Sequence, residues 1–178
     1  MKPVKQVDPL EAYCRKALEM GIDEAKVVDP SSVTTAEWVR MKCQFGCSRY
    51  GKGLCCPPYL PPPDRTRRVL DSYQNAILLH KKFKGRETAT GFNETMVRLE
   101  REIFLDGCYK AWSMGTGPCR ICEECDPKGL CRYGFRARPS MEACGIDVFR
   151  TARENGFSVE VVRTHDKERN HFGLVLVE

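Results

Sequence analysis

The sequence predicts an α/β protein: a single domain spanning residues 1–178, with a mixed sheet flanked by helices and two cysteine-rich loops. Three observations support this class. The chain is long enough for one hydrophobic core but short for two. Segments with apolar residues at helical spacing alternate with short apolar runs that are typical of buried strands. Two stretches rich in cysteine, glycine and proline interrupt the alternation, and we expect both to be loops.

The chain begins with a predicted helix, a strand and a second helix. Apolar residues recur at helical spacing over residues 8–20, and Gly21 is a helix stop signal. Within this helix we expect Cys14 to pack as a small apolar residue. The run at residues 25–28 indicates a strand. Serines and threonines that follow it are candidate N-caps for a helix that continues through Met41.

The alternation continues beyond the first cysteine-rich stretch. A helix is predicted from Asp64, a fully buried strand at residues 76–79, and a longer amphipathic helix capped by Asn93. A short strand at residues 110–114 would then lead directly into the second cysteine-rich stretch. Loops at strand ends are frequent ligand sites in open α/β sheets, so this position favours a functional role.

The last third of the chain is predicted to be a helix followed by two strands. The helix starts near Ser140, and the strands occupy residues 157–162 and 172–177. A solvent-exposed hairpin turn is predicted for the polar link between these strands. Metal ligation by His165 or His171, which lie at its two ends, is the alternative.

Composition excludes several classes of protein. A hydrophobic content of 42% with 30% charged residues is ordinary for a globular domain and excludes a disordered chain. No apolar run approaches the length of about 18 residues that spans a membrane, and the first residues lack the apolar core of a signal peptide, so we expect a cytoplasmic protein without membrane contact. The net charge of +5 comes without interleaved aromatic residues, which argues against nucleic-acid binding.

Eleven cysteines in a reducing compartment indicate metal binding or catalysis rather than disulfides. The strongest pattern is in the second stretch, where Cys119, Cys122 and Cys125 have CxxCxxC spacing and Cys131 follows after five residues. The run is similar to the iron–sulfur pattern CxxCxxCxxxCP, although Arg132 stands where the proline would be. Zinc, which usually takes two separated CxxC pairs, is the alternative metal.

The first stretch is a looser pattern. Its candidate ligands are Cys43, Cys47 and Cys56. A CxxxCxxC radical-type run is excluded because Tyr50 occupies the position of its third cysteine. Adjacent Cys55 and Cys56 would point in opposite directions on an extended backbone, which favours Cys56 alone as a ligand. The fourth ligand is therefore Cys55, Cys144 or an open position where a substrate could bind a metal.

Four segments resemble a known family: KCQFGCSRYGKGLCCPPYLPPP, LDSY, GPCRICEEC and RPSMEACGIDV. They are similar to the prokaryotic domain-of-unknown-function family 2284, described as predicted metal-binding proteins, and the resemblance extends from Trp38 to Phe157. It implies that the metal-binding cysteines are Cys43, Cys47, Cys56, Cys119, Cys122, Cys125 and Cys131. It also implies an anaerobic setting in which oxygen-sensitive clusters survive. Cys55 and Cys144 are additional to the family pattern, and the proline expected after Cys131 is absent.

These observations lead to one expected function and two alternatives. We expect two [4Fe–4S] clusters and electron transfer to or from a partner redox protein. The first alternative is a zinc-stabilised binding module without a redox role. The second is an enzyme that uses an open iron position in the first cysteine-rich stretch.

Overall fold

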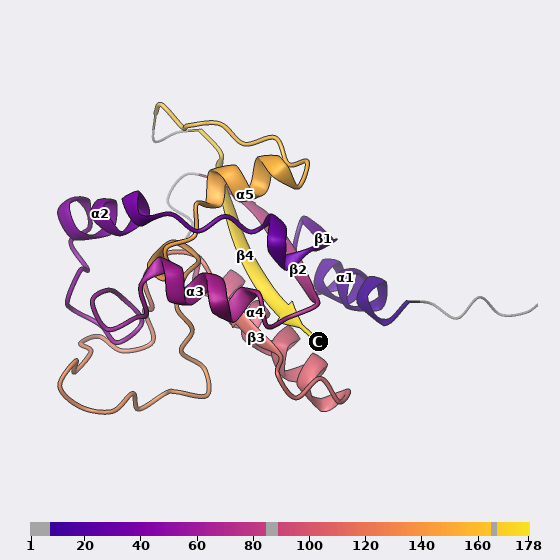
Figure 1. The fold of residues 1–178 in the computed structure, drawn as a ribbon, viewed down its shortest axis with the longest axis horizontal. Helices are drawn as coiled ribbons and strands as arrows, with labels where there is room; N and C mark the ends of the chain where they lie inside the picture. Colours follow the sequence, from indigo (N-terminus) through magenta and orange to yellow (C-terminus); the bar gives the residue numbers. More distant parts are fainter. Residues whose placement is uncertain (1–7, 85–88, 165–166) are drawn as a thin grey trace, which may run out of the picture.

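The computed structural model describes residues 8–84, 89–164 and 167–178, and a four-stranded sheet lies at the centre of this part of the chain (Figure 1). The sheet order is β1-β2-β4-β3. The strands are β1 (Glu24–Val28), β2 (Asn75–Phe83), β3 (Trp112–Met114) and β4 (Arg169–Val177). The predicted α/β class is confirmed. All pairings between these strands are antiparallel, whereas the sequence suggested a mixed sheet.

Five α-helices and two 3₁₀ turns surround the sheet in the described residues. They are α1 (Pro9–Glu19), α2 (Glu37–Gly46), α3 (Pro63–Leu70), α4 (Thr90–Leu105), α5 (Val148–Glu154), η1 (Pro30–Ser32) and η2 (Glu142–Cys144). Capping side chains and prolines explain where several of these helices begin. The Asp8 side chain accepts a hydrogen bond from the Leu10 N–H at the start of α1, and Asp147 caps α5 in the same way. Proline occupies the first position of both α1 and α3, where its missing N–H costs nothing.

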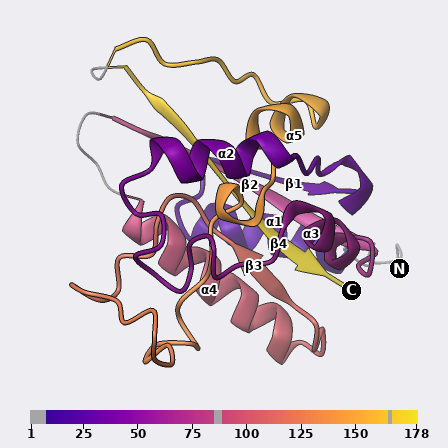
Figure 2. The same cartoon turned by 60° about the vertical axis from the view of Figure 1, so that its left-hand side comes forward.

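The sheet is covered on both faces (Figure 2). Side chains alternate along a strand, so neighbouring residues of β2 belong to two hydrophobic clusters on opposite faces of the sheet. Ile77 and Leu79 pack in the cluster with α1 and α4. Leu78 packs in the cluster with α3, η2 and α5. Cys14 is buried in the first of these clusters, as predicted. Both faces of β2 are thus apolar, which accounts for its continuous hydrophobic run.

Three predicted elements differ in the structure. Residues 157–162 form no strand, because Phe157 and Val159 cover the face of the sheet and the Phe157 ring packs edge-on against Phe172 at 5.4 Å between centroids. The helix predicted near Ser140 is divided into η2 and α5. The helix predicted after Pro30 is also divided, into η1 and α2, and α2 continues to Gly46. Cys43 therefore lies in a helix and not in a loop.

The polar link before β4 is only partly described. His165 lies outside the described residues. His171 is a residue of β4 and pairs with Lys81 of β2, so it lies in the sheet and not in a solvent-exposed turn. None of the helices in the described ranges has the length and apolarity that crossing a bilayer requires.

Helix α4 packs closely against the sheet at Gly173 of β4. A Cβ atom at this position would lie 2.1 Å from Met96 Sδ and 3.0 Å from the Phe92 ring, both on α4. We expect Gly173→Ala to lower the free energy of unfolding by about 1–3 kcal/mol, because the buried side chains must move to admit a methyl group. Urea unfolding measures the change. Gly91→Ala is the control, since no atom lies within 4 Å of its added Cβ, and equal midpoints for the two variants would contradict the prediction.

Candidate metal centre

The two cysteine-rich loops lie side by side at one end of the molecule (Figures 1 and 2). A small cavity of about 20 Å³ lies between them. Six cysteines line it: Cys55, Cys56, Cys119, Cys122, Cys125 and Cys131. The packing is close, because a Cβ atom on Gly53 of the first loop would lie 3.9 Å from Cys125 Sγ of the second. The sequence predicted two separate loops, and the structure places two cysteines of the first loop with four of the second around one cavity, whose lining does not include Cys43 and Cys47.

The first loop begins where α2 ends, and this places two of its cysteines one turn apart. Cys43 is in the last turn of α2, and Cys47 is the residue directly after the helix. Cys56 is buried. Burial raises the pKa values of Cys43 and Cys56, and the nearby Cys47 raises both further. The three cysteines are thus electrostatic neighbours, and a bound cation would favour the thiolate forms of Cys43 and Cys56.

Cys55 is turned towards the second loop. Its thiol is hydrogen-bonded to Cys119, which raises the pKa of Cys55 and lowers that of Cys119. The Ile121 N–H and the positive charge of Arg49 lower the pKa of Cys119 further. Cys119 is consequently the thiol of this pair that ionises first. The turn around these residues is closed by a hydrogen bond from the Cys56 N–H to the Gly53 carbonyl, so the backbone is not extended here.

Cys144, the other candidate for a fourth ligand, is part of the hydrophobic core. It lies in η2, is 5% exposed and packs in the cluster that contains Leu70 and Met141. Burial raises the pKa of its thiol to about 12, which keeps it protonated at neutral pH. Cys144 does not line the small cavity.

The cysteines of the small cavity suit a soft metal by their chemistry. Of the described residues that line the cavity, none is histidine, aspartate or glutamate, so its strong ligands are all sulfur. Within residues 8–84, 89–164 and 167–178, however, no three cysteine, histidine or acidic side chains converge closely enough to hold a metal ion. The thiols line one cavity, but their sulfur atoms do not converge on a common point. Binding a metal ion therefore requires the cysteine side chains to change rotamer.

The second loop is held at its base. Gly115 and Ser140 form a parallel bridge, and the N–H of Gly115 donates to the Pro139 carbonyl at 2.8 Å. Asn93 of α4 forms two hydrogen bonds to the backbone of Thr116, the residue after Gly115. Its Oδ1 accepts from the Thr116 N–H and its Nδ2 donates to the Thr116 carbonyl, both at 3.0 Å. Asn93 was predicted to cap α4, but α4 starts at Thr90 and the side chain fixes the loop instead.

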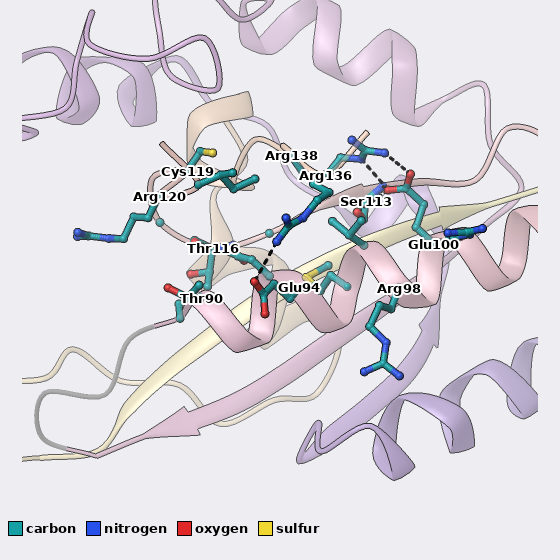
Figure 3. Close-up of a pocket in the computed structure, with 18 of the residues that line it drawn as sticks. Thr90, Glu94, Arg98, Glu100, Ser113, Thr116, Cys119, Arg120, Arg136 and Arg138 are labelled. Carbon is teal, nitrogen blue, oxygen red and sulfur yellow. Dashed lines mark hydrogen bonds and ion pairs between the residues drawn. The ribbon is translucent and has the colours of Figure 1, made fainter. Parts of the chain in front are cut away.

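A buried ion pair joins the far end of the same loop to α4 (Figure 3). Arg138 donates from Nε and Nη2 to the two Glu100 carboxylate oxygens at 2.8 and 2.6 Å. Glu100 Oε2 also accepts from the Ser113 N–H and hydroxyl group, at 2.8 and 2.6 Å. Both side chains of the pair are about one-tenth exposed, so the interaction is little weakened by water.

A second, much larger cavity of about 1590 Å³ lies between α4 and the second cysteine loop (Figure 3). Cys119 and Ile121 line both cavities, so the large cavity and the group of thiols share a wall. His171 lies in the wall formed by β4, and its Nδ1 is 3.0 Å from the Thr116 hydroxyl oxygen. Burial lowers the pKa of His171, with smaller contributions from Arg169 and His80, so its ring is neutral at pH 7.

Comparison with known proteins identifies the family. Residues 26–177 match the family described as "Predicted metal-binding protein (DUF2284)". The chain belongs to this family. The match covers both cysteine loops and the whole sheet except the start of β1, so the resemblance seen in four short segments extends over most of this chain. No curated protein and no solved structure matches the chain.

The spacing of residues did not reveal every part of this DUF2284 site. The residues that anchor the second loop are far apart in the sequence: Asn93, Glu100 and Arg138. His171, in the wall of the large cavity, is distant in sequence from all three. Arg138 begins one of the four family segments, whereas Glu100, Asn93 and His171 belong to none of them. The available sequence signal was the set of three arginines, Arg132, Arg136 and Arg138, that follows the last cysteine of the loop.

Proposed function

We propose that this DUF2284 protein binds two [4Fe–4S] clusters through its cysteine loops and exchanges electrons with a partner redox enzyme. The observation that carries the proposal is the group of six cysteines, from both loops, around one cavity whose strong ligands are all sulfur. Thiolates are the usual ligands of iron–sulfur clusters, and the CxxCxxC run brings three of them within one short turn.

The ligands divide between the two loops. Cys119, Cys122, Cys125 and Cys131 would hold one cluster, and Cys43, Cys47 and Cys56 would hold the other. Bound clusters would supply one-electron storage. Cys55, hydrogen-bonded to Cys119, is a further donor at the boundary between the two sets. Arg49 stabilises thiolate at Cys119 and would offset the negative charge that thiolate ligation brings.

The test is chemical analysis of protein purified without oxygen. We expect about eight iron and eight acid-labile sulfide atoms per chain, and a visible absorbance that dithionite bleaches. Stoichiometric zinc without sulfide, obtained after anaerobic reconstitution with iron and sulfide, would overturn the proposal.

One observation favours a second candidate, a zinc-stabilised binding module. The cavity between the loops, about 20 Å³, has room for a single ion as it stands, whereas a four-iron cluster requires the loops to separate. The same analysis distinguishes the two, because zinc gives neither sulfide nor a visible absorbance. The zinc module would have no role in electron transfer.

A further inference from the structure

The large cavity has an excess of positive charge. Among the described residues that line it are two glutamates, Glu94 and Glu100, and six arginines: Arg98, Arg101, Arg120, Arg136, Arg138 and Arg169. Glu100 is fully engaged by Arg138 and Ser113. Arg98, Arg101 and Arg120 form no ion pair with any residue in the described ranges. A cavity with this balance attracts anions.

Large apolar side chains also line this cavity. Phe104 and Leu105 at the end of α4 are 51% and 66% exposed, and Phe135 of the second loop is 72% exposed. Met96 and Ile121 are further apolar residues of the lining. Uncovered aromatic and aliphatic groups gathered in a concave surface are typical of sites that bind organic molecules. The lining therefore suits a ligand with an apolar body and an anionic group, and not a bare inorganic ion.

Arg136 is the arginine best placed to bind the anionic group. It reaches from the loop across to Glu94 on α4, so this ion pair connects the two walls of the cavity (Figure 3). The contact is single and long, 3.3 Å between Arg136 Nη2 and Glu94 Oε1, and the side chains are 46% and 58% exposed. An exposed pair of this kind contributes little stability, so a ligand anion can displace Glu94 at small cost.

We propose that the large cavity binds an organic anion whose phosphate or carboxylate group pairs with Arg136 in place of Glu94, with its apolar body against the apolar side chains of the same cavity, among them Phe135. Arginine suits either group, because its planar guanidinium can donate two parallel hydrogen bonds. The bound molecule would lie beside Cys119, which lines both cavities. Arg136 and Glu94 are not among the proposed metal ligands, so the inference goes beyond the proposed function.

The experiment is a fluorescence titration of the anaerobically purified protein with 8-anilinonaphthalene-1-sulfonate, an apolar anion. Its uncharged counterpart, N-phenyl-1-naphthylamine, has the same ring system without the sulfonate. We expect Arg136→Met to weaken binding of the sulfonate about tenfold or more, since a charge-assisted hydrogen bond is lost. Glu94→Gln removes the competing carboxylate and should tighten binding. Neither change should alter binding of the uncharged probe. Arg65→Met, an exposed arginine of α3 outside the cavity, is the matched control.

Displacement of the probe then identifies the natural anionic group. Phenyl phosphate and benzoate each carry one phenyl ring and differ in their anionic group. Stronger competition by phenyl phosphate indicates that the natural ligand carries a phosphate group. Stronger competition by benzoate indicates a carboxylate group. Equal affinities of the sulfonate for wild type, Arg136→Met and Glu94→Gln would overturn the proposal. That result is independent of iron and sulfide content, so failure here is distinguishable from failure of the proposed function.

Discussion

Replacing Cys122 with serine is expected to remove about half of the bound iron and sulfide and to lower the stability of the protein markedly. Cys122 is the middle cysteine of the CxxCxxC run and lines the small cavity between the loops. A metal centre that binds only the folded chain adds its binding free energy to folding, so loss of a ligand is also loss of stability. Metal and sulfide analysis, with thermal unfolding under nitrogen, measures both effects.

Cys108→Ser is the matched control for that variant. Cys108 is half-buried like Cys122, but it packs against the core beside α1 and α4 and lies in neither cysteine loop. We expect it to retain full metal content. If both serine variants kept wild-type iron and sulfide, Cys122 would not be a ligand. If both lost them equally, the loss would reflect general damage to the fold.

Replacing Arg138 with methionine should lower the free energy of unfolding by about 3–5 kcal/mol. The variant leaves the Glu100 carboxylate buried with only Ser113 as its partner. It also removes the guanidinium that lies 4.4 Å from the centre of the Trp112 ring. Denaturant unfolding gives the magnitude.

Three further variants test the ion pair itself: a surface control, Glu100→Gln alone, and the double variant. Arg68→Met removes one partner of an exposed pair, in which Arg68 and Asp64 are 64% and 58% exposed, and it should change stability little. The double variant Arg138→Met with Glu100→Gln should be more stable than the sum of the two single changes predicts, because the uncompensated buried charge is absent. Strict additivity would mean that Arg138 and Glu100 do not interact energetically.

Most helices and strands were predictable because the patterns that specify them are local. Periodicity and caps placed the helix at residues 8–20 and the buried strand at residues 76–79, and the structure has α1 and β2 there. The family was also recognisable, since its cysteine motifs are short and contiguous. Residues 157–162 were wrongly predicted to form a strand. Their apolar side chains Phe157 and Val159 pack on the face of the sheet that contains Phe172. An apolar run that packs on a sheet has the same sequence pattern as one that pairs within it.

The arrangement of the site depended on which distant segments meet. Spacing indicated that Cys119, Cys122 and Cys125 act together, but the packing of one loop against the other is what brings Cys55 to Cys119. The same holds for the large cavity, whose walls come from α4, β4 and the second loop. The spacing of cysteines along the chain specifies which thiols a single turn of the backbone can bring together. The order and register of the strands, set by burial of the core, specify which loops become neighbours.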